Sequence, residues 1–181
     1  IQLALDETLR TIDNAARNEF IPSTVFKPTA FAISKVLEKK GTGNNLTPEE
    51  EKEFEKFRNR VDTLCKKAFE MDVPIMVDAE HYCYQDSIDA VVMEMMEKYN
   101  HKKAIVYNTY QMYRHDRMDV FRRDLEIARK KNFYLGIKFV RGAYMEKERE
   151  RAARLGYPSP IHPDKESTDR AYDAALKFAI E

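Results

Sequence analysis

Polar side chains that could do chemistry stand directly after four short apolar runs of the sequence. If each run is a strand of one parallel sheet, the carboxyl ends of these strands meet at a single edge, where α/β proteins bind their ligands. The side chains at the four points are Lys27; Asp78, Glu80 and His81; Asn108 and Gln111; and Lys138, Arg141 and Tyr144.

The fourth point is the richest in chemical groups. Lys138 and Arg141 provide two cations, and Gly142 and Ala143 separate Arg141 from Tyr144. Two small residues let a ligand approach the backbone closely. The cations suit an anionic ligand, and a tyrosine ring suits the wall of an apolar slot. We therefore expect a flat, anion-tolerant ligand here.

Three other positions carry groups for the same kind of ligand. Lys27 is either a surface lysine at a strand end or a cation that polarises a bound ring or carboxylate. Asn108 and Gln111 carry neutral amides, which are not bases near neutral pH but hydrogen-bond well to planar heterocycles. Lys165 and Thr168 lie where a helix is expected to begin, and backbone N–H groups there either bind phosphate or are capped without a ligand.

Asp78, Glu80 and His81 form the tightest acidic group. They either cap the following helix and carry solvated charge, or they hold a divalent metal for a barrel lyase or isomerase. Adjacent residues after a strand point to different sides, so three such side chains rarely converge. We expect Asp78, the first residue past the apolar run, to point inward, and we predict no metal site.

Strand and helix patterns alternate along the chain. Thr47 and Glu50 form a capping box, with Pro48 at the first helical position of an amphipathic helix. An alternative to an enzyme is a non-catalytic interaction module that uses this helix as its docking face. Strands are predicted at residues 23–28, 73–77, 104–107 and 133–140. Helices are predicted at residues 1–18, 30–39, 47–71, 88–99, 116–131, 145–155 and 167–180, the last one capped by its serine.

This alternation predicts a parallel sheet covered by helices. No GxGxxG sequence follows an expected strand, which argues against a Rossmann-type dinucleotide site. Four strands cannot close a barrel. We therefore predict an α/β fold that is part of a (β/α)₈ barrel, with residues 1–181 in one partial barrel domain and residues 41–72 forming a loop and a capped helix within it.

Composition sets further limits. Hydrophobic residues make up 43% of the chain, which is enough for a core, and 31 basic residues balance 31 acidic ones, which argues against a nucleic-acid partner. Cys65 and Cys83 lack CxxC spacing and are expected to be reduced thiols. The sequence has no long apolar run, so we expect no membrane span, although peripheral contact with a membrane remains compatible.

Six motifs occur in an order that resembles the proline dehydrogenase family. The most specific is the Phe-Val-Arg-Gly-Ala-Tyr run at residues 139–144, with Glu-Arg-Ala-Ala-Arg-Leu-Gly-Tyr-Pro at 150–158 behind it. The resemblance begins near Thr24, and the polar insert at residues 41–45 favours the stand-alone bacterial type. The other motifs are Val25-Phe-Lys27, Met76-Val-Asp-Ala-Glu80, Tyr107-Asn-Thr-Tyr-Gln111, Gly156-Tyr-Pro158 and Lys165-Glu-Ser-Thr168.

The resemblance implies a distorted (β/α)₈ barrel with FAD at the carboxyl ends of its strands. A hydride would pass from C5 of proline to N5 of the flavin, leaving 1-pyrroline-5-carboxylate. A cation near the N1–O2 locus of the ring would stabilise the developing charge by about 3 kcal/mol. The implied catalytic or substrate residues are Lys27, Asp78 and Tyr144, with Phe139 opposite Tyr144; the implied cofactor residues are Asn108, Lys138, Arg141, Gly142, Ala143, Lys165 and Thr168.

The resemblance also sets expectations beyond these residues. The family holds the substrate carboxylate with an arginine pair near its C-terminal end, which this chain lacks, so the isolated chain is expected to bind FAD weakly and oxidise proline poorly. Its electrons are expected to reach a membrane quinone. The expected location is the bacterial cytoplasm, peripheral at the inner membrane, or alternatively the matrix side of the mitochondrial inner membrane. An open barrel edge is expected to favour self-association.

Overall fold

The structure, a computed structural model, describes residues 1–180 of the chain. Its centre is a sheet of four parallel strands in which neighbours along the chain are also neighbours in the sheet. A doubly wound sheet would instead reverse its order at a switch point. The order β1-β2-β3-β4 is that of a (β/α)₈ barrel, so the predicted fold class is confirmed. The strands are β1 (Thr24–Phe26), β2 (Ile75–Val77), β3 (Val106–Gln111) and β4 (Gly136–Val140).

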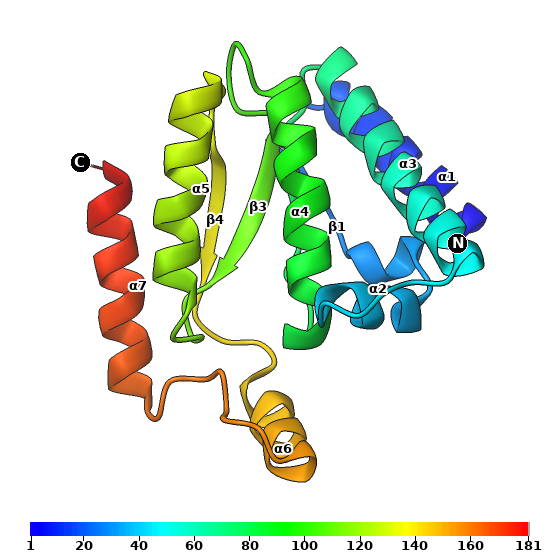
Figure 1. The fold of residues 1–181 in the computed structure, drawn as a ribbon. Coiled ribbons are helices and arrows are strands. Elements are labelled where there is room, and N and C mark those ends of the chain that lie inside the picture. The colour runs from blue at the N-terminus through cyan, green and yellow to red at the C-terminus, as the bar shows by residue number, and fades with distance from the viewer. Residues whose placement is uncertain (181) are drawn as a thin grey trace.

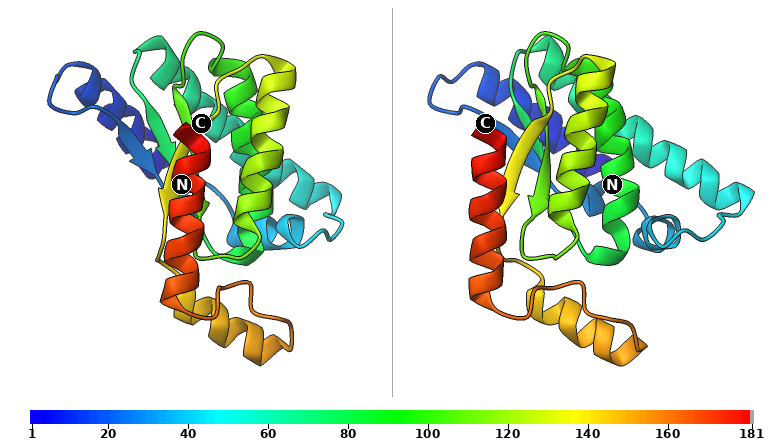
Figure 2. Two further views of the ribbon diagram at one scale, coloured as in Figure 1. Left: turned by 90° about the vertical axis from the view of Figure 1, so that its left-hand side faces the viewer. Right: turned by 60° about the vertical axis from the view of Figure 1, so that its left-hand side comes forward.

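Helices connect and flank the strands. In Figure 1, α4 and α5 lie in front of the sheet, the strands point towards α6, and α7 runs beside α5 and β4. Figure 2 shows that α4 and α5 cover one side of the sheet. In the described part of the chain the helices are α1 (Gln2–Ala16), a 3₁₀ helix η1 (Pro28–Phe31), α2 (Ser34–Gly41), α3 (Pro48–Glu70), α4 (Tyr82–Tyr99), α5 (Arg117–Lys131), α6 (Met145–Leu155) and α7 (Lys165–Ile180).

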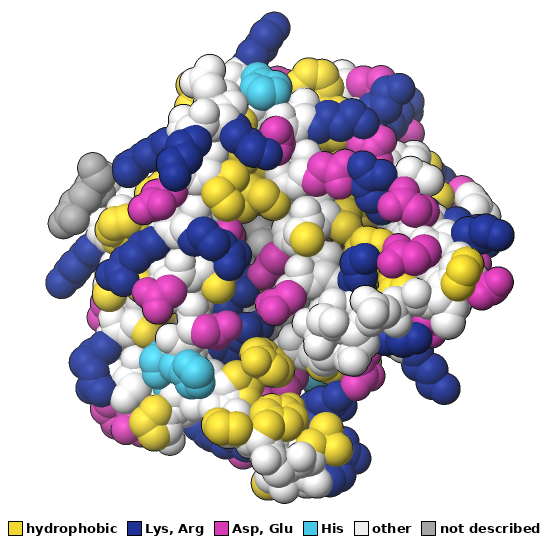
Figure 3. Space-filling view, viewed as in Figure 1, with side chains coloured by type: hydrophobic (Ala, Val, Ile, Leu, Met, Phe, Trp, Pro, Cys, Tyr) yellow, Lys and Arg dark blue, Asp and Glu magenta, His cyan; other side chains and the backbone are white. Residues whose placement is uncertain are grey.

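The apolar stripe of α3 belongs to the core. Phe57, Val61 and Leu64 are almost fully buried, in one cluster with Ile75 and Val77 of the sheet. Its burial overturns the alternative in which α3 offers a docking face to a partner. The outer face of the helices carries interspersed positive and negative side chains instead (Figure 3).

The capping box at the start of α3 is confirmed. Thr47 Oγ1 accepts a hydrogen bond from the backbone N of Glu50 at 3.3 Å, and Glu50 Oε2 accepts one from the backbone N of Thr47 at 2.7 Å. Each group satisfies one backbone donor that the first turn of a helix leaves free. The local sequence therefore fixes this helix start.

Several predicted boundaries were wrong: the helix expected at 30–39 is α2 at Ser34–Gly41, and the strand expected from 133 begins at Gly136. Three further differences have a clear physical reason. Helix α4 begins six residues before the predicted position 88, because its first turns bury polar side chains that break the apolar period. Strand β3 runs through Gln111, so Asn108 lies inside the strand and not after it. Helix α7 begins at Lys165, two residues early, because Asp164 Oδ1 accepts from the backbone N of Ser167 at 2.6 Å and takes the capping role that was assigned to Ser167.

The register of the sheet decides which side chains share a face. Side chains alternate between the two faces along a strand, and residues paired in register on parallel strands point the same way. Val25 pairs with Met76, Met76 with Tyr107, and Tyr107 with Gly136. Val25 is 52% exposed, so this row lies on the face that α4 and α5 leave uncovered, here called the open face. The other face, covered by helices, is called the helix face.

Asn100, which follows α4, is completely buried and links two strands. Its Oδ1 accepts from the backbone N atoms of Ile105 and Val106, each at 2.9 Å. Its Nδ2 donates to the carbonyl oxygens of Val106 at 2.9 Å and Tyr134 at 2.8 Å. All four hydrogen bonds of the amide are therefore satisfied by backbone groups next to β3 and β4.

We expect Asn100→Asp to lower the free energy of unfolding by roughly 3 kcal/mol, because the new oxygen faces two buried carbonyl oxygens. Chemical denaturation measures this loss. The exposed Asn59 of α3 offers the same substitution as a control, and Asn59→Asp should change stability by less than about 0.5 kcal/mol. Equal losses in the two variants would contradict the linking role of Asn100.

Gly136 marks a close approach of β4 to β3. A Cβ atom there would lie 2.1 Å from the carbonyl oxygen of Val106 and 2.9 Å from the Cα of Tyr107. We expect Gly136→Ala to cost about 1–3 kcal/mol of stability through overpacking. At Gly142 the nearest atom to such a Cβ is Met145 Sδ, at 3.8 Å, so Gly142→Ala is the control. A thermal midpoint lowered equally by both substitutions would refute the steric cause.

Candidate functional site

Two of the predicted site residues form an ion pair on the open face. Lys138 Nζ, on β4, lies 2.5 Å from Oδ1 of Asp78, which directly follows β2. The side chains are 29% and 28% exposed, so the pair is accessible from the sheet surface. Lys138 pairs in register with Thr109, and the pair therefore reaches across β3. The two residues converge as the sequence predicted.

Lys27 shares this face with the ion pair. It lies two residues beyond Val25 and so points to the same side of β1. Its side chain is exposed, and it forms no ion pair with any of residues 1–180. The open face thus carries one paired and one unpaired lysine near the carboxyl ends of its strands.

Tyr144 lies at the same carboxyl edge, after β4, on the opposite side of the sheet from β1. Its hydroxyl donates to Oε2 of Glu80 at 2.9 Å. Burial and the hydrogen bond to Glu80 raise the pKa of Tyr144 well above its ordinary value, so the phenol keeps its proton at neutral pH. Its ring lies 4.3 Å from that of His81, centroid to centroid.

The amide of Gln111 is buried at the end of β3. Its Nε2 donates to the carbonyl oxygen of Glu80 at 2.8 Å and to the hydroxyl oxygen of Tyr113 at 2.7 Å. Burial raises the pKa of Tyr113 to about 12. Gln111 pairs in register with Val140, two residues beyond Lys138, and therefore belongs to the open face.

Asn108 and Phe139 lie on the helix face. Asn108 Nδ2 donates to Oδ1 of Asp89 on α4 at 2.8 Å, and the residue is 2% exposed. The ring of Phe139 lies 5.2 Å from that of Phe121 on α5 and 6.4 Å from that of Tyr172 on α7. The structure does not bring either residue to Lys138 or Tyr144, because each is one position out of phase with the open face.

A second group of predicted residues meets beside α7. Arg141 Nη1 lies 3.1 Å from Oδ1 of Asp169, and Lys165 forms an ion pair with the other oxygen of the same carboxylate. Arg141 also lies over the ring of Tyr172, 5.0 Å from its centroid. Thr168 is buried, and its Oγ1 donates to the carbonyl oxygen of Asp164 at 3.2 Å. Two cations thus share one carboxylate at this position.

Gly142 and Ala143 connect the two groups. Both residues are exposed. A Cβ on Gly142 would meet little of the chain, as the 3.8 Å distance above shows. The backbone between Arg141 and Tyr144 is therefore open to a ligand.

The three residues of the acidic group point to different partners. Asp78 pairs with Lys138 and Glu80 with Tyr144, while His81 Nδ1 lies 2.7 Å from Oε1 of Glu148 on α6. Among residues 1–180 no group of three His, Cys, Asp or Glu side chains is placed to hold a metal ion. The arrangement gives no support to the metal-dependent lyase or isomerase.

Glu148 was not predicted from the sequence. It is 1% exposed, and its Oε1 also accepts from the backbone N of Tyr82 at 3.0 Å. This carboxylate therefore caps α4 from a helix 66 positions away in the sequence. The interaction holds α6 against the carboxyl edge of the sheet. No local motif at the start of α4 could have revealed it, because the capping group is distant in sequence.

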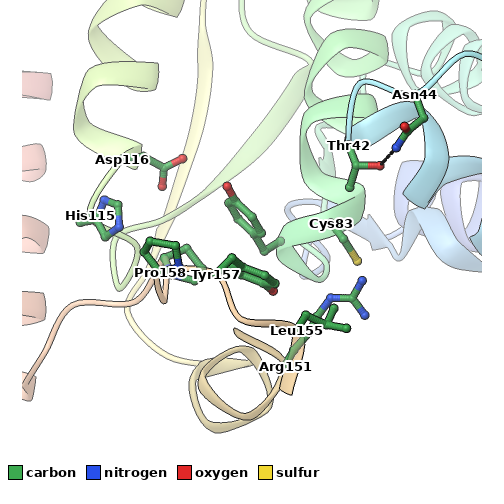
Figure 4. Close-up of a pocket in the computed structure, with 11 residues that line it drawn as sticks. Thr42, Asn44, Cys83, His115, Asp116, Arg151, Leu155, Tyr157 and Pro158 are labelled. Carbon is green, nitrogen blue, oxygen red and sulfur yellow. Dashed lines mark hydrogen bonds between the residues drawn. The ribbon is translucent and has the colours of Figure 1, made fainter. Parts of the chain in front are cut away.

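A cavity of about 610 Å³ lies outside this edge, between α4 and α6. Figure 4 shows Cys83 of α4 facing Arg151 and Leu155 of α6, with Tyr157 beside them. None of the predicted site residues lines the cavity. Lys27, Asp78 and Lys138 lie instead on the open face, with Tyr144 at its edge, so we place the candidate site there.

None of the helices in residues 1–180 is both long and apolar enough to cross a membrane.

Comparisons with known proteins identify relatives of the chain. A family model described as "Proline dehydrogenase" matches residues 1–181. Proline dehydrogenase 1, mitochondrial, of Drosophila melanogaster is 47% identical over 137 residues, which cover 76% of this chain and 20% of that protein. The Homo sapiens protein of the same name is 42% identical over 138 residues, covering 76% of this chain and 23% of that protein. The chain therefore spans about a fifth of the length of these relatives.

Solved structures share the fold. Proline utilization A from Bdellovibrio bacteriovorus matches 98% of this chain and 19% of its own, with a TM-score of 0.82 at 18% identity. A second structure, titled as proline utilization A with proline bound in remote sites, has a TM-score of 0.81, also at 18% identity, and covers 96% of this chain and 18% of its own. At such identities the likeness establishes the fold alone.

The source organisms of the relatives can be compared with the predicted bacterial type of the protein. Those from Drosophila and Homo sapiens are eukaryotic and named mitochondrial, so the preference for a stand-alone bacterial type, drawn from residues 41–45, has no support in them. The family model covers every residue, and both relatives exceed 40% identity. The chain therefore belongs to the proline dehydrogenase family.

Proposed function

We propose that the protein containing this chain oxidises L-proline to 1-pyrroline-5-carboxylate with FAD, as a step of proline catabolism. The observation that carries the proposal is the convergence of Lys138, Asp78 and Lys27 on the open face, beside Tyr144. The names of the relatives supply the reaction class. The chain would contribute four strands, with their helices, to a complete barrel.

The cations of the candidate site suit a flavin ring and its pyrophosphate. A ring that gains negative charge on reduction needs a fixed cation nearby, and Lys138 is held in place by Asp78. The unpaired Lys27 provides a second cation on the same face. Arg141 and Lys165 share a single carboxylate, Asp169, which leaves a net positive charge for phosphate groups.

The remaining residues would complete the cofactor site. The exposed Gly142 and Ala143 would let the ring or the pyrophosphate lie against the backbone. Thr168 would contact the ADP portion near the start of α7. Gln111 lies on the open face and is a better placed amide than Asn108, whose amide is engaged with Asp89 on the helix face.

FAD, when bound, would supply the acceptor for the hydride that leaves C5 of proline. The residues of this chain bind and orient the two partners. Lys138 and Lys27 would hold negative charge near the reacting ring. Tyr144 keeps its proton at neutral pH, so it would act as a wall and a hydrogen-bonding group, not as a base. Phe139 is packed on the helix face and would shape the slot from behind.

The proposal extends to location and partners. The relatives named mitochondrial support the mitochondrial matrix side of the inner membrane as the location. A membrane quinone would be the final electron acceptor.

The full-length protein should show the visible absorption band of a bound flavin, and anaerobic L-proline should bleach it. Hydroxyproline is the comparison substrate, because the Hydroxyproline dehydrogenase of Xenopus laevis is 36% identical over 122 residues. Absorption spectroscopy before and after each addition measures the effect. A colourless protein that carries a divalent metal would overturn the proposal in favour of the metal-dependent enzyme.

Replacing Lys138 by Met should weaken flavin retention about tenfold, since losing one charge-assisted contact costs about 1.4 kcal/mol. Flavin occupancy after gel filtration of the full-length protein gives the measurement. Lys131→Met is the matched control, because Lys131 also forms an ion pair, at 2.5 Å with Glu97, but lies at the far end of α5. Unchanged occupancy in Lys138→Met would contradict the assigned role.

A further inference from the structure

Glu80 is a buried carboxylate held by neutral groups. It is 4% exposed, and no Lys, Arg or His among residues 1–180 forms an ion pair with it. Its Oε1 accepts from Thr29 Oγ1 at 2.6 Å and its Oε2 from the hydroxyl of Tyr144 at 2.9 Å. Both carboxyl oxygens of Glu80 therefore have a hydrogen-bond partner, and neither is left as an unsatisfied buried polar atom.

The backbone of Glu80 extends the same network. Its carbonyl oxygen accepts from Gln111 Nε2 at 2.8 Å, and its backbone N donates to Gln85 Oε1 on α4, also at 2.8 Å. Thr29 follows β1, Gln111 ends β3 and Tyr144 follows β4. Glu80, which follows β2, therefore links the carboxyl ends of all three remaining strands, β1, β3 and β4.

We propose that Glu80 is a positioning residue that fixes Tyr144 with its hydroxyl proton directed away from the substrate, so that the phenol oxygen accepts a hydrogen bond from the N–H of a cyclic secondary amine. This inference rests on the function proposed above. It assigns Glu80 a role through Tyr144, without contact between Glu80 and the substrate.

The structure gives the direction of the hydrogen bond between the two side chains. The hydroxyl of Tyr144 donates, and Oε2 of Glu80 accepts. A phenol donates one proton, and its oxygen lone pairs then remain for a donor such as an amine N–H. Thr29 donates to the other oxygen of Glu80, which keeps the carboxylate from rotating.

Four groups face Tyr144. Glu80, Tyr113 and Asp78 each raise its pKa, and the ring of His81 packs against its ring. Of these, Glu80 is the one that hydrogen-bonds the hydroxyl. Burial is the largest cause that raises the pKa of Tyr144, and Glu80 is the next. Removing the charge of Glu80 should therefore lower this pKa towards its ordinary value of 10.0 without removing the effect of burial.

The test compares Glu80→Gln, Tyr144→Phe and the double variant in the full-length protein. Glu80→Gln keeps the size of the side chain but replaces one acceptor oxygen by a donor, so one of the two hydroxyl groups loses its partner. Glu148→Gln is the matched control, because it neutralises a carboxylate that is equally buried at the same edge but does not touch Tyr144. Tyrosinate difference absorption against Tyr144→Phe reports the pKa of Tyr144 without substrate.

We expect Glu80→Gln to lower the pKa of Tyr144 and Glu148→Gln to leave it unchanged. With L-proline, kcat/KM should fall about tenfold in Glu80→Gln, mainly through KM, and much less when Tyr144 is already Phe. A Tyr144 pKa that Glu80→Gln leaves unchanged overturns the inference, and so do losses that add fully in the double variant.

Two further measurements keep the test decisive. If Glu80→Gln does not fold, the unaltered protein still gives an answer, since ionisation of Tyr144 near 10.0 would overturn the pairing with Glu80. An unaltered protein that does not oxidise proline refutes the proposed function, whereas the substrate-free titration still decides whether Glu80 holds Tyr144.

Discussion

The alternation of side chains across four parallel strands is the constraint on which the site depends. The register places Met76, Tyr107 and Gly136 in one row, and every second residue beyond that row shares its face. Lys138 and Asp78 are in phase with this row and meet, although they are 60 positions apart in the sequence. Asn108 and Phe139 are one position out of phase and face the helices.

Buried polar contacts hold the two edges of the sheet in different ways. At the amino edge, Asn100 satisfies backbone groups at the start of β3 and just before β4. At the carboxyl edge, Glu80 and Glu148 accept from side chains and backbone groups of other loops. Each of these three residues is polar and almost fully buried, so each fixes geometry that apolar packing alone would leave adjustable.

Local signals in the sequence were enough for the fold and for the meeting of Lys138 with Asp78. Apolar runs located all four strands, and the Thr47 capping box located the start of α3, because both depend on neighbouring residues. The convergence of Lys138 and Asp78 followed from the strand-end rule. The length of β3 could not be read in the same way, because Asn108 to Gln111 are polar residues inside a strand. That error moved Asn108 to the wrong face.

Contacts between distant segments account for what the sequence did not reveal. The sequence groups Glu80 with its neighbours Asp78 and His81, either as capping and solvated charge or as metal ligands. Its partners Thr29 and Tyr144 lie 51 positions before it and 64 positions after it, so no local spacing could pair them. A strand pattern extended through Gln111 would have placed that amide, and not Asn108, on the same face as Lys138.

The capping of α4 by Glu148 bears on the order in which the chain assembles. A ribosome releases the residues of α4 well before it adds Glu148, so during synthesis the first turn of that helix lacks its distant acceptor. The Asn100 contacts close earlier, because they need nothing beyond Tyr134. The amino side of the sheet is therefore ready first. On the ligand-facing side, the contact between Glu148 and the start of α4 can form only after α6 has been synthesised.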